Sequence, residues 1–402
     1  MPWGDASIIY DRSLSIFQQA SYPTDTIFPY PPSAVIVFHA FALGGPAAFM
    51  GAWYALMVLG LLVSANASLA RESRDVRAAW LVIGLIAMLL ADSPISWDLR
   101  NANSNLIYLG IVMAGYGLLA RRPSLAGALI GLSMAFKLYS GLLLIWLLVN
   151  GPRRALHTAG LTIIVLWLIL PVALFGADGT HSLYETWIGQ LRIISDPLLH
   201  ARLAAAAGGP PLVTLERAVV ALTGGDFGST KTLMWLWTLW SLWLGVLALY
   251  AWRWQGSAPT SAPSRSALAD WTVLLLAPLP FSPWLEPYHA APLFLGALLC
   301  IVIANDKDAL RKDRLAALFA LATLFLFIVI RVPFAVRGLG MTTQFVVMVL
   351  VLAFIRPRLD RPQAAGLDQQ QRRQRSAPGA LNTRYGPPHE LQTRSTGATL
   401  SL

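Results

Sequence analysis

Apolar residues gather in blocks along the chain, and short polar or charged segments separate these blocks. With their flanks, the blocks approach the roughly 20 residues that a helix needs to cross a hydrocarbon core of about 30 Å. Lipid offers backbone N–H and C=O groups no partner, so each block is predicted to be a helix, which satisfies those groups internally. The most apolar cores are Ala47–Ala67, Ala78–Leu90, Leu106–Leu119, Leu156–Phe175, Leu233–Tyr250, Val273–Pro283, Pro292–Ala304, Leu315–Ile330 and Phe345–Phe354.

Short loops rich in Arg and Lys set the direction of the chain, because such loops stay on the cytoplasmic side. They comprise residues 71–77, 121–122, 153–154, 253 with 265, and 307–314. All of them share one side only if Pro123–Asn150 enters the membrane and returns as a broken pair of short helices that meets near Lys137. The pattern then predicts an all-α, polytopic transmembrane bundle of about eleven segments, with the N-terminus outside and the C-terminus inside.

Composition agrees with this pattern and narrows the chemistry. Hydrophobic residues make up 56% of the chain and charged residues 12%, whereas about 25% of a soluble domain is charged. Cys300 is the single cysteine, which excludes a disulfide within the chain and a Cys-based metal site. The histidines lack metal-ligand spacing, and neither a P-loop nor a dinucleotide-binding fingerprint is present. The sequence therefore predicts no metal and no cofactor.

The net charge of +10 is concentrated near the C-terminus, where eight arginines stand against three acidic residues from Arg356 onward. This stretch is also rich in Gln, Pro, Gly, Ser and Thr, which is typical of disorder. Residues 356–402 are therefore predicted to form a basic, disordered cytoplasmic tail that lies near anionic lipid headgroups. Binding of the tail to nucleic acid is the less favoured alternative.

Ionisable residues outside the cytoplasmic loops lie mostly in the predicted outer segments of a transmembrane domain that spans residues 1–355. The main outer loops are residues 1–45, 95–104 and 176–230. A transporter would place ionisable groups within its spans, near the midplane, but here Lys137 is the clearest one at membrane depth. This asymmetry favours an active site at the outer surface over a channel.

Three stretches together carry a family resemblance: residues 4–42, which include YPP at 30–32; residues 93–155; and residues 281–294, which include SPWLEPYH. Their order resembles the membrane glycosyltransferases of family 87, a group that includes α-mannosyltransferases acting on envelope glycolipids. That family has an outer-loop Asp before a Tyr, then YPP, a Gly-Gln-x-Asn helix start, a Gly…Lys-x-x-Pro segment and a Ser-Pro…Trp…His segment.

The resemblance implies a GT-C fold in a bacterial inner membrane, with the active site on the non-cytoplasmic face. It implies a polyprenyl-phosphate sugar as donor, with mannose the family's commonest hexose, and a lipid or glycan as acceptor. Inverting transfer by single displacement needs one base for the acceptor hydroxyl and positive groups beside the departing phosphate. A phosphate leaving group needs little protonation, so a second catalytic carboxylate is not required.

Carried onto this chain, the family pattern makes Asp5 the candidate general base, with Asp11 as the fallback. An exposed acid at a frayed terminus is the alternative reading of Asp5. Tyr30 begins the YPP segment, which either contributes to substrate binding or only shapes the entry into the next helix, because its prolines fix φ.

Arg100, Asn103 and Asn105 stand where an outer loop enters a predicted helix, and all three are candidate substrate ligands. Arg100 suits a phosphate because its planar fork pairs with two oxygens. Helix capping is the alternative for either asparagine. Here the chain departs from the family, because Ala-Asn-Ser-Asn replaces Gly-Gln-x-Asn.

Lys137 is expensive at membrane depth unless it is paired or faces water, so it is a candidate ligand of the donor phosphate. Snorkelling of its ammonium group to the interface is the alternative. The family's proline three residues later is Ser140 in this chain, so a softer helix break is expected.

In the third stretch, Glu286 and His289 are candidate substrate ligands, and Trp284 is expected to anchor the chain at the interface. Residues 176–230 are expected to include an amphipathic helix along the membrane surface. The family has a membrane helix before its outer-loop Asp, whereas this sequence begins four residues before Asp5. The expectation is therefore either that the start codon is assigned too late or that the protein has lost this first span. The alternatives to an enzyme are a lipid-linked sugar flippase, a secondary transporter and an inactive paralogue.

Overall fold

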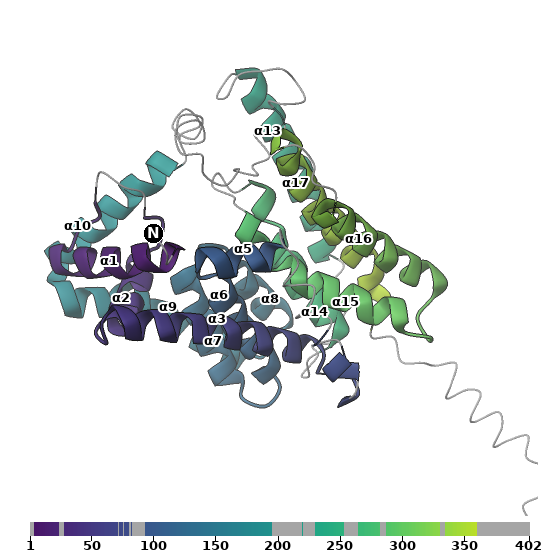
Figure 1. Ribbon diagram of the computed structural model, residues 1–402, viewed down its shortest axis with the longest axis horizontal. Helices are drawn as coiled ribbons and strands as arrows, with labels where there is room; N and C mark the ends of the chain where they lie inside the picture. Colours follow the sequence, from purple (N-terminus) through teal and green to yellow (C-terminus); the bar gives the residue numbers. More distant parts are fainter. Residues whose placement is uncertain are drawn as a thin grey trace, which may run out of the picture. The chain divides into compact units, whose positions relative to one another are not determined.

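The computed structural model describes residues 4–23, 28–70, 72–74, 76–79, 82, 93–194, 219, 230–252, 264–281, 287–329 and 334–359. Every regular element within these ranges is helical, which confirms the all-α prediction for them (Figure 1). The first elements are α1 (Gly4–Gln19), α2 (Pro32–Ala42), α3 (Pro46–Ser68), α5 (Pro94–Asn101), α6 (Asn105–Leu118), α7 (Pro123–Phe136), η1 (Leu138–Gly141), α8 (Leu142–Asn150), α9 (Arg153–Ile164), η2 (Val165–Ile169) and α10 (Leu170–Ile194). They are followed by α13 (Thr230–Trp252), α14 (Arg265–Leu276), η4 (Leu279–Phe281), η5 (Pro287–Ala290), α15 (Leu293–Asn305), α16 (Arg311–Val329), α17 (Phe334–Ile355) and η6 (Arg356–Arg358).

The helices α3, α6, α7 and α9 pack in sequence, each against the next (Figure 1). Glycines make the closest approaches possible. A methyl group at Gly110 of α6 would overlap the backbone of Gly60 in α3, and a methyl group at Gly127 of α7 would overlap the Ala155 carbonyl of α9. Small residues allow this backbone contact between apolar helices, where dispersion replaces the hydrophobic driving force.

The break predicted near Lys137 is present between α7 and α8. Lys137 ends α7 in an extended conformation, with φ −143° and ψ 113°, and the 3-10 turn η1 follows. The Ser140 hydroxyl donates to the Lys137 carbonyl at 2.8 Å, so a serine helps to stabilise the break where the family has proline. Tyr139 packs edge to face on Tyr108 of α6, with ring centres 5.5 Å apart, and this contact fixes η1 against α6.

The segment from α9 to α10 contains two departures from α-helix. The π-turn η2 precedes Pro171, which has no N–H to donate to the Trp167 carbonyl four residues earlier. The Tyr184 hydroxyl donates to that carbonyl instead. This is possible because the chain turns at Gly176, whose φ of 71° is in the left-handed region that favours glycine.

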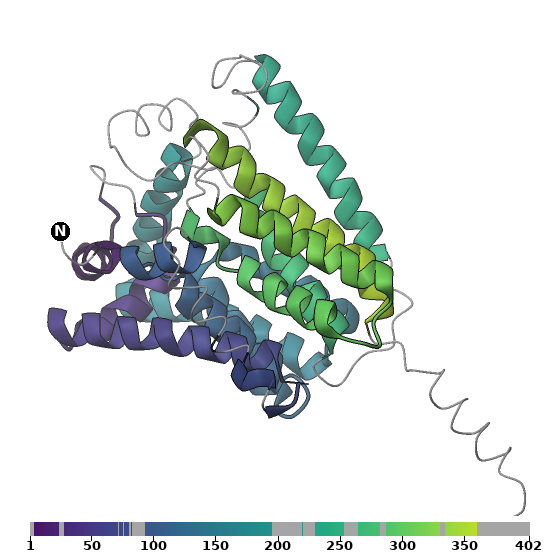
Figure 2. The same cartoon turned by 45° about the vertical axis from the view of Figure 1, so that its right-hand side comes forward.

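Helices α14, α15, α16 and α17 form a second set of neighbours, in which α15 packs on α16, α16 on α17, and α14 on both α15 and α17 (Figure 2). The prediction of one apolar helical core over Val273–Pro283 is wrong. Helix α14 ends at Leu276, and the 3-10 turn η4 follows. Pro278 and Pro280 explain the difference, because neither can donate the hydrogen bond that a continuing helix requires.

Two helical segments among the described residues are long and apolar enough to cross a membrane, Pro46–Ser68 and Arg153–Arg192, and the second contains the turn at Gly176. Several shorter apolar helices of 10–17 residues accompany them. These features and the exposed apolar side chains of α9 and α13 indicate a membrane protein. The count of about eleven segments stays a prediction, and most of the predicted core Ala78–Leu90 lies outside the described residues.

The chain divides into two units at residues 360 and 361. The second unit, residues 361–402, lies outside the described residues, so the disordered tail stays a prediction. Two arginines predicted to begin that tail are part of the first unit. Arg356 pairs with Asp270, and Arg358 pairs with Asp313.

Candidate functional site

A tight turn joins α5 to α6 and carries both candidate asparagines; we call Ala102–Asn105 the asparagine turn. Ser93 caps the start of α5 by accepting from the Ser96 N–H at 3.0 Å. At the other end Ala102 adopts a left-handed conformation with φ 50°. The Trp53 indole of α3 donates to the Ala102 carbonyl at 2.8 Å, which stabilises this strained residue against a neighbouring helix.

The asparagines do not cap α6, so the capping alternative is wrong. Ser104 is the N-cap residue, and its side chain makes no capping bond. Asn103 is buried, and its Oδ1 accepts from the Ser104 N–H at 2.7 Å and from Asn105 Nδ2 at 2.9 Å. The two amides therefore fix each other within the turn.

Asp98 is a buried carboxylate beneath the asparagine turn. It is 0% exposed, although it stands on the short helix α5. Its Oδ1 accepts from Asn105 Nδ2 at 2.8 Å, and its Oδ2 accepts from the Leu106 N–H at 2.9 Å. A negative charge at the N-terminus of α6 is favoured by the helix dipole, so Asp98 supplies the cap that Ser104 does not.

Tyr30 reaches the asparagine turn from a distant part of the chain. Its hydroxyl lies 3.0 Å from Ser104 Oγ and donates to Asn103 Oδ1 at 3.5 Å. Its ring faces Lys137, whose Nζ lies 5.4 Å from the ring centre. This distance is within the range of a cation–π interaction. We call Tyr30, Asn103, Ser104, Asn105 and Lys137 the Asn–Lys cluster.

Side chains from the second half of α10 hold the chain just before the YPP segment. Gln190 is buried; its Oε1 accepts from the Phe28 N–H at 3.2 Å, and its Nε2 donates to the Pro23 carbonyl. Trp187 donates to the Pro29 carbonyl at 3.3 Å. Side chains rather than a strand therefore satisfy the backbone before Tyr30 and set its position.

Tyr22 adds a second support for Tyr30. Its hydroxyl donates to the Tyr30 carbonyl at 2.7 Å, and its N–H donates to Thr186 of α10 at 3.0 Å. Burial raises the pKa of the Tyr22 phenol well above its ordinary value, so the hydroxyl stays protonated and keeps this bond.

The buried face of α10 after Gly176 consists of Thr180, Leu183, Trp187 and Gln190, and the opposite face exposes His181, Glu185 and Ile188. The predicted amphipathic helix is thus present up to Ile194. Its placement along a membrane surface stays a prediction, and residues 195–218 and 220–230 add no described side chain.

The structure places the other predicted ligands only in part. Arg100 is exposed at the end of α5 and has no ion pair with a described residue. His289 is half-buried in η5, which packs against α5. Asp5 lies in α1, which also contacts α5, but its side chain is outside the described part of the structure. Glu286, like Trp284, lies outside the described residues.

Comparison with known protein families identifies the family of this chain. The sequence profile of glycosyltransferase family 87 matches residues 28–279, which is more than half of the 402 residues. The chain belongs to glycosyltransferase family 87. No curated protein and no solved structure matches it. Family membership makes the protein a glycosyltransferase and confirms the resemblance inferred from the three stretches.

The region matched to family 87 contains the whole Asn–Lys cluster, whereas Asp5, Glu286 and His289 lie outside it. Within the cluster, the structure brings together three stretches that are far apart in sequence. Among the described residues, no group of three or more His, Cys, Asp or Glu side chains is arranged to hold a metal ion.

Two members of this site were not predicted from sequence, Asp98 and Ser104. Asp98 lies in the predicted outer loop 95–104, and Ser104 stands at the variable position of the family's Gly-Gln-x-Asn motif. The available signal was the spacing of seven residues between Asp98 and Asn105 across a short helix. That spacing alone does not predict burial, because an eight-residue helix usually exposes its polar residues.

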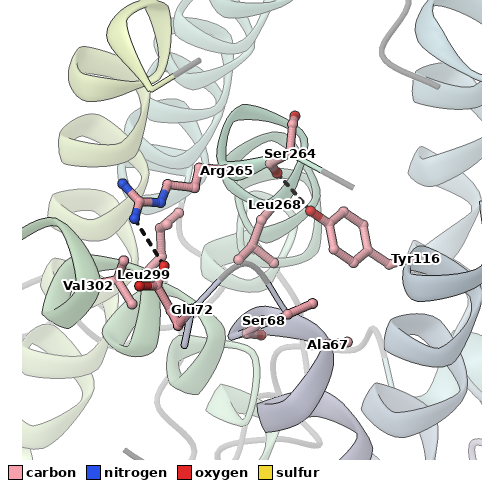
Figure 3. Close-up of a pocket in the computed structure, with 10 residues that line it drawn as sticks. Ala67, Ser68, Glu72, Tyr116, Ser264, Arg265, Leu268, Leu299 and Val302 are labelled. Carbon is pink, nitrogen blue, oxygen red and sulfur yellow. Dashed lines mark hydrogen bonds and ion pairs between the residues drawn. The ribbon is translucent and has the colours of Figure 1, made fainter. Parts of the chain in front are cut away.

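A small pocket occurs elsewhere, near the ends of α3, α14 and α15 (Figure 3). Arg265 pairs with Glu72 at 2.9 Å and also with Asp306, and the Tyr116 hydroxyl donates to the Ser264 carbonyl at 2.7 Å. Two carboxylates already neutralise the arginine, so the pocket is unsuited to a phosphate. These ion pairs instead join the ends of α3, α14 and α15.

Proposed function

We propose that this family 87 member transfers a hexose, mannose in the first instance, from a polyprenyl-phosphate donor to a lipid or glycan acceptor on the non-cytoplasmic face of the membrane. The observation that carries the proposal is the convergence of Tyr30, Asn103 and Lys137 at one point from three separate stretches of sequence. A lysine in an apolar segment is costly unless it has a function or a partner.

The Asn–Lys cluster supports binding of an anionic group next to a polyol. The Lys137 ammonium supplies a positive charge, and the Tyr30 ring limits the directions from which an anion approaches it. Asn105 Oδ1 is buried and accepts no hydrogen bond from the described residues. An unpartnered buried acceptor costs about 1–3 kcal/mol, so a donor such as a sugar hydroxyl would stabilise it.

The proposed reaction is a single displacement with inversion. The acceptor oxygen attacks the anomeric carbon, the bond from that carbon to the phosphate oxygen breaks, and polyprenyl phosphate leaves with the electron pair. Lys137 stabilises the negative charge that grows on the phosphate, an effect that is largest in a site with few waters. A general base removes the acceptor proton.

We propose Asp5 as that base. Its helix α1 contacts α5, the helix that leads into the asparagine turn. His289 and Arg100 are proposed as further substrate ligands, since η5 and α5 pack together. Glu286 is proposed from the family pattern alone, because it lies outside the described residues. Asp5→Asn is expected to abolish transfer without reducing the amount of folded protein.

A donor screen tests the proposed function. Purified protein in nanodiscs is mixed with a membrane lipid extract and radiolabelled polyprenyl-phosphate mannose, glucose or galactose, and labelled glycolipid is measured. Lys137→Met is expected to lower kcat by about 100-fold, as loss of one charge-stabilising group usually does. Lys312→Met, an exposed lysine on α16, serves as the matched control and should keep full activity.

Two results would contradict the proposal. Wild-type protein that consumes none of the donors would exclude a polyprenyl-phosphate hexose of these types. Translocation of lipid-linked sugar across proteoliposomes without sugar transfer would favour the flippase instead. A rise in KM with unchanged kcat in Lys137→Met would restrict Lys137 to ground-state binding.

A further inference from the structure

Asp98 stands out among the buried ionisable groups because it bonds a member of the Asn–Lys cluster, although nothing in the proposed reaction requires its charge. It is 0% exposed, and burial of a carboxylate is costly unless hydrogen bonds and charges compensate it. Asp98 is also unusual because it caps α6 although it is not the N-cap residue of that helix. Ser104 occupies the N-cap position of α6, where a serine side chain would ordinarily suffice.

The Ser104 hydroxyl makes no cap because it contacts Tyr30 instead, at 3.0 Å. Asp98 caps α6 from outside by accepting from the Leu106 N–H. The buried carboxylate therefore leaves Ser104 available to hold the Tyr30 hydroxyl. In this way the Asp98 carboxylate on α5 affects both Ser104 and Tyr30.

A carboxylate also fixes the orientation of the Asn105 amide. Ionised Asp98 has only acceptors, so Asn105 must present its NH₂ group toward it. That NH₂ group donates to Asp98 Oδ1 at 2.8 Å and to Asn103 Oδ1 at 2.9 Å. The Asn105 carbonyl oxygen is thereby turned away from both, and no described residue donates to it.

We propose that Asp98 is a positioning residue of the sugar-transfer site, which holds the Asn105 amide with its carbonyl oxygen available to a hydroxyl of the donor sugar. This inference rests on the proposed function, since it assigns the ligand of Asn105 within that site. Asp98 itself does not contact substrate and takes no proton from the acceptor.

The isosteric variant Asp98→Asn separates orientation from shape. An asparagine at this position has a donor as well as an acceptor, so the Asn105 amide is free to reverse and to satisfy its own carbonyl. The expected result is a fall in kcat of about 10- to 100-fold, because misplacement of a contact group costs up to about 100-fold. KM should change by less than about 3-fold.

Coupling to Asn105 is the decisive measurement, because an effect on stability alone would not produce it. Asn105→Ala should lower kcat by a similar factor, and the double variant should be no slower than the slower single variant. Consumption of radiolabelled polyprenyl-phosphate mannose, glucose and galactose is measured, with the fastest donor used for all variants. Asp178→Asn, an exposed acid on α10, is the matched control.

The outcomes separate the two ideas. Wild-type protein that consumes no donor overturns the proposed function and this inference with it. Active wild type with Asp98→Asn as fast as Asp178→Asn overturns the inference alone, as do losses that multiply in the double variant. If Asp98→Asn yields no folded protein, Asn105→Ala decides: full kcat in that variant, with an unchanged melting temperature, rejects the assignment.

Discussion

Removal of Arg356 should destabilise the protein by leaving a buried charge without its partner. Arg356 stands at the end of α17 and pairs with Asp270 of α14, and both side chains are buried. Its Nε donates to Asp270 Oδ1 at 3.0 Å and its Nη2 to Oδ2 at 3.2 Å. The Trp146 indole and the Tyr250 hydroxyl donate to the same carboxylate at 3.1 Å and 2.5 Å.

The magnitude follows from these distances. Two unit charges 3.0 Å apart attract by about 5 kcal/mol at an effective dielectric constant of about 20. In Arg356→Met the carboxylate keeps two neutral hydrogen bonds but loses its cation, and breaking a buried pair in this way costs about 3–5 kcal/mol. In the double variant Asp270→Asn/Arg356→Met no charge remains, so most of that loss should be recovered.

The assay is thermal unfolding in detergent, followed by the fluorescence of the 15 tryptophans. At about 2 °C per kcal/mol for a large domain, Arg356→Met should lower the apparent melting temperature by about 6–10 °C, and the double variant by less than about 4 °C. All samples share one scan rate, because irreversible unfolding makes the value rate-dependent. Arg122→Met, at an exposed arginine, is the matched control and should shift it by about 1 °C at most.

Two results would refute this reasoning. If Arg356→Met and Arg122→Met melt alike, the pair with Asp270 contributes nothing to the stability of the folded unit. If the double variant melts as low as Arg356→Met, the loss comes from missing side-chain contacts and not from an unpaired carboxylate.

Three further predictions concern other contacts. Gly110→Ala should lower stability by about 1–3 kcal/mol, because the added methyl group overlaps the backbone of Gly60. Gln190→Leu should increase hydrogen exchange in residues 20–32, because it leaves two buried backbone groups unpaired. Burial alone would raise the pKa of Asp306, but hydrogen bonds and the charge of Arg265 outweigh it and lower the pKa below its ordinary value of 3.8. The stability from this pair is present above pH 3.8 and is lost as the pH falls through the lowered pKa.

Each of these has a control or a contradicting result. Gly160→Ala meets no neighbour within 4 Å, so it should raise stability by up to about 1 kcal/mol; loss of stability in both glycine variants would reject the packing argument. Thr158→Val on α9, far in sequence from the Gln190 contacts, should leave exchange in residues 20–32 unchanged. Asp306→Asn should melt lower than wild type at neutral pH, and the difference should vanish in acid; a constant difference would exclude the ionised pair.

Much of the fold could be predicted because backbone groups in lipid must form their hydrogen bonds within the protein, whereas water can also satisfy irregular backbone. An apolar block in a membrane protein is a helix, and the helices found at α3, α6, α15 and α16 follow the predicted cores closely. The break at Lys137 was predictable from charge placement alone, since the basic loops can share one side only if the segment between them is a returning pair of short helices. The end of α14 was missed because hydropathy does not register that proline lacks an N–H.

The site was predictable in its members but not in its connections. Tyr30, Asn103 and Lys137 could be named from the family pattern, because residue type and order survive in the sequence. Their contacts depend on the left-handed residue Ala102 and on the hydrogen bonds of Gln190 to the backbone before Tyr30. Neither feature produces a periodic pattern in the sequence. Whether a short helix buries an acid such as Asp98 is decided by tertiary packing, which local propensity does not determine.

Two buried polar networks in this chain differ in how fully their groups are satisfied, and this difference separates structure from function. The Asp270 carboxylate accepts four hydrogen bonds from two helices, α8 and α13, and the 3-10 turn η6, which leaves little capacity for a ligand. Asp98 is equally buried, but the amide that it orients ends in Asn105 Oδ1, to which no described residue donates. Buried polar groups in native proteins are nearly always paired, so an exception calls for an explanation. The fully paired network joins helices that lipid alone would not hold together, while the incomplete one lies in the proposed sugar-transfer site, where a sugar hydroxyl would complete it.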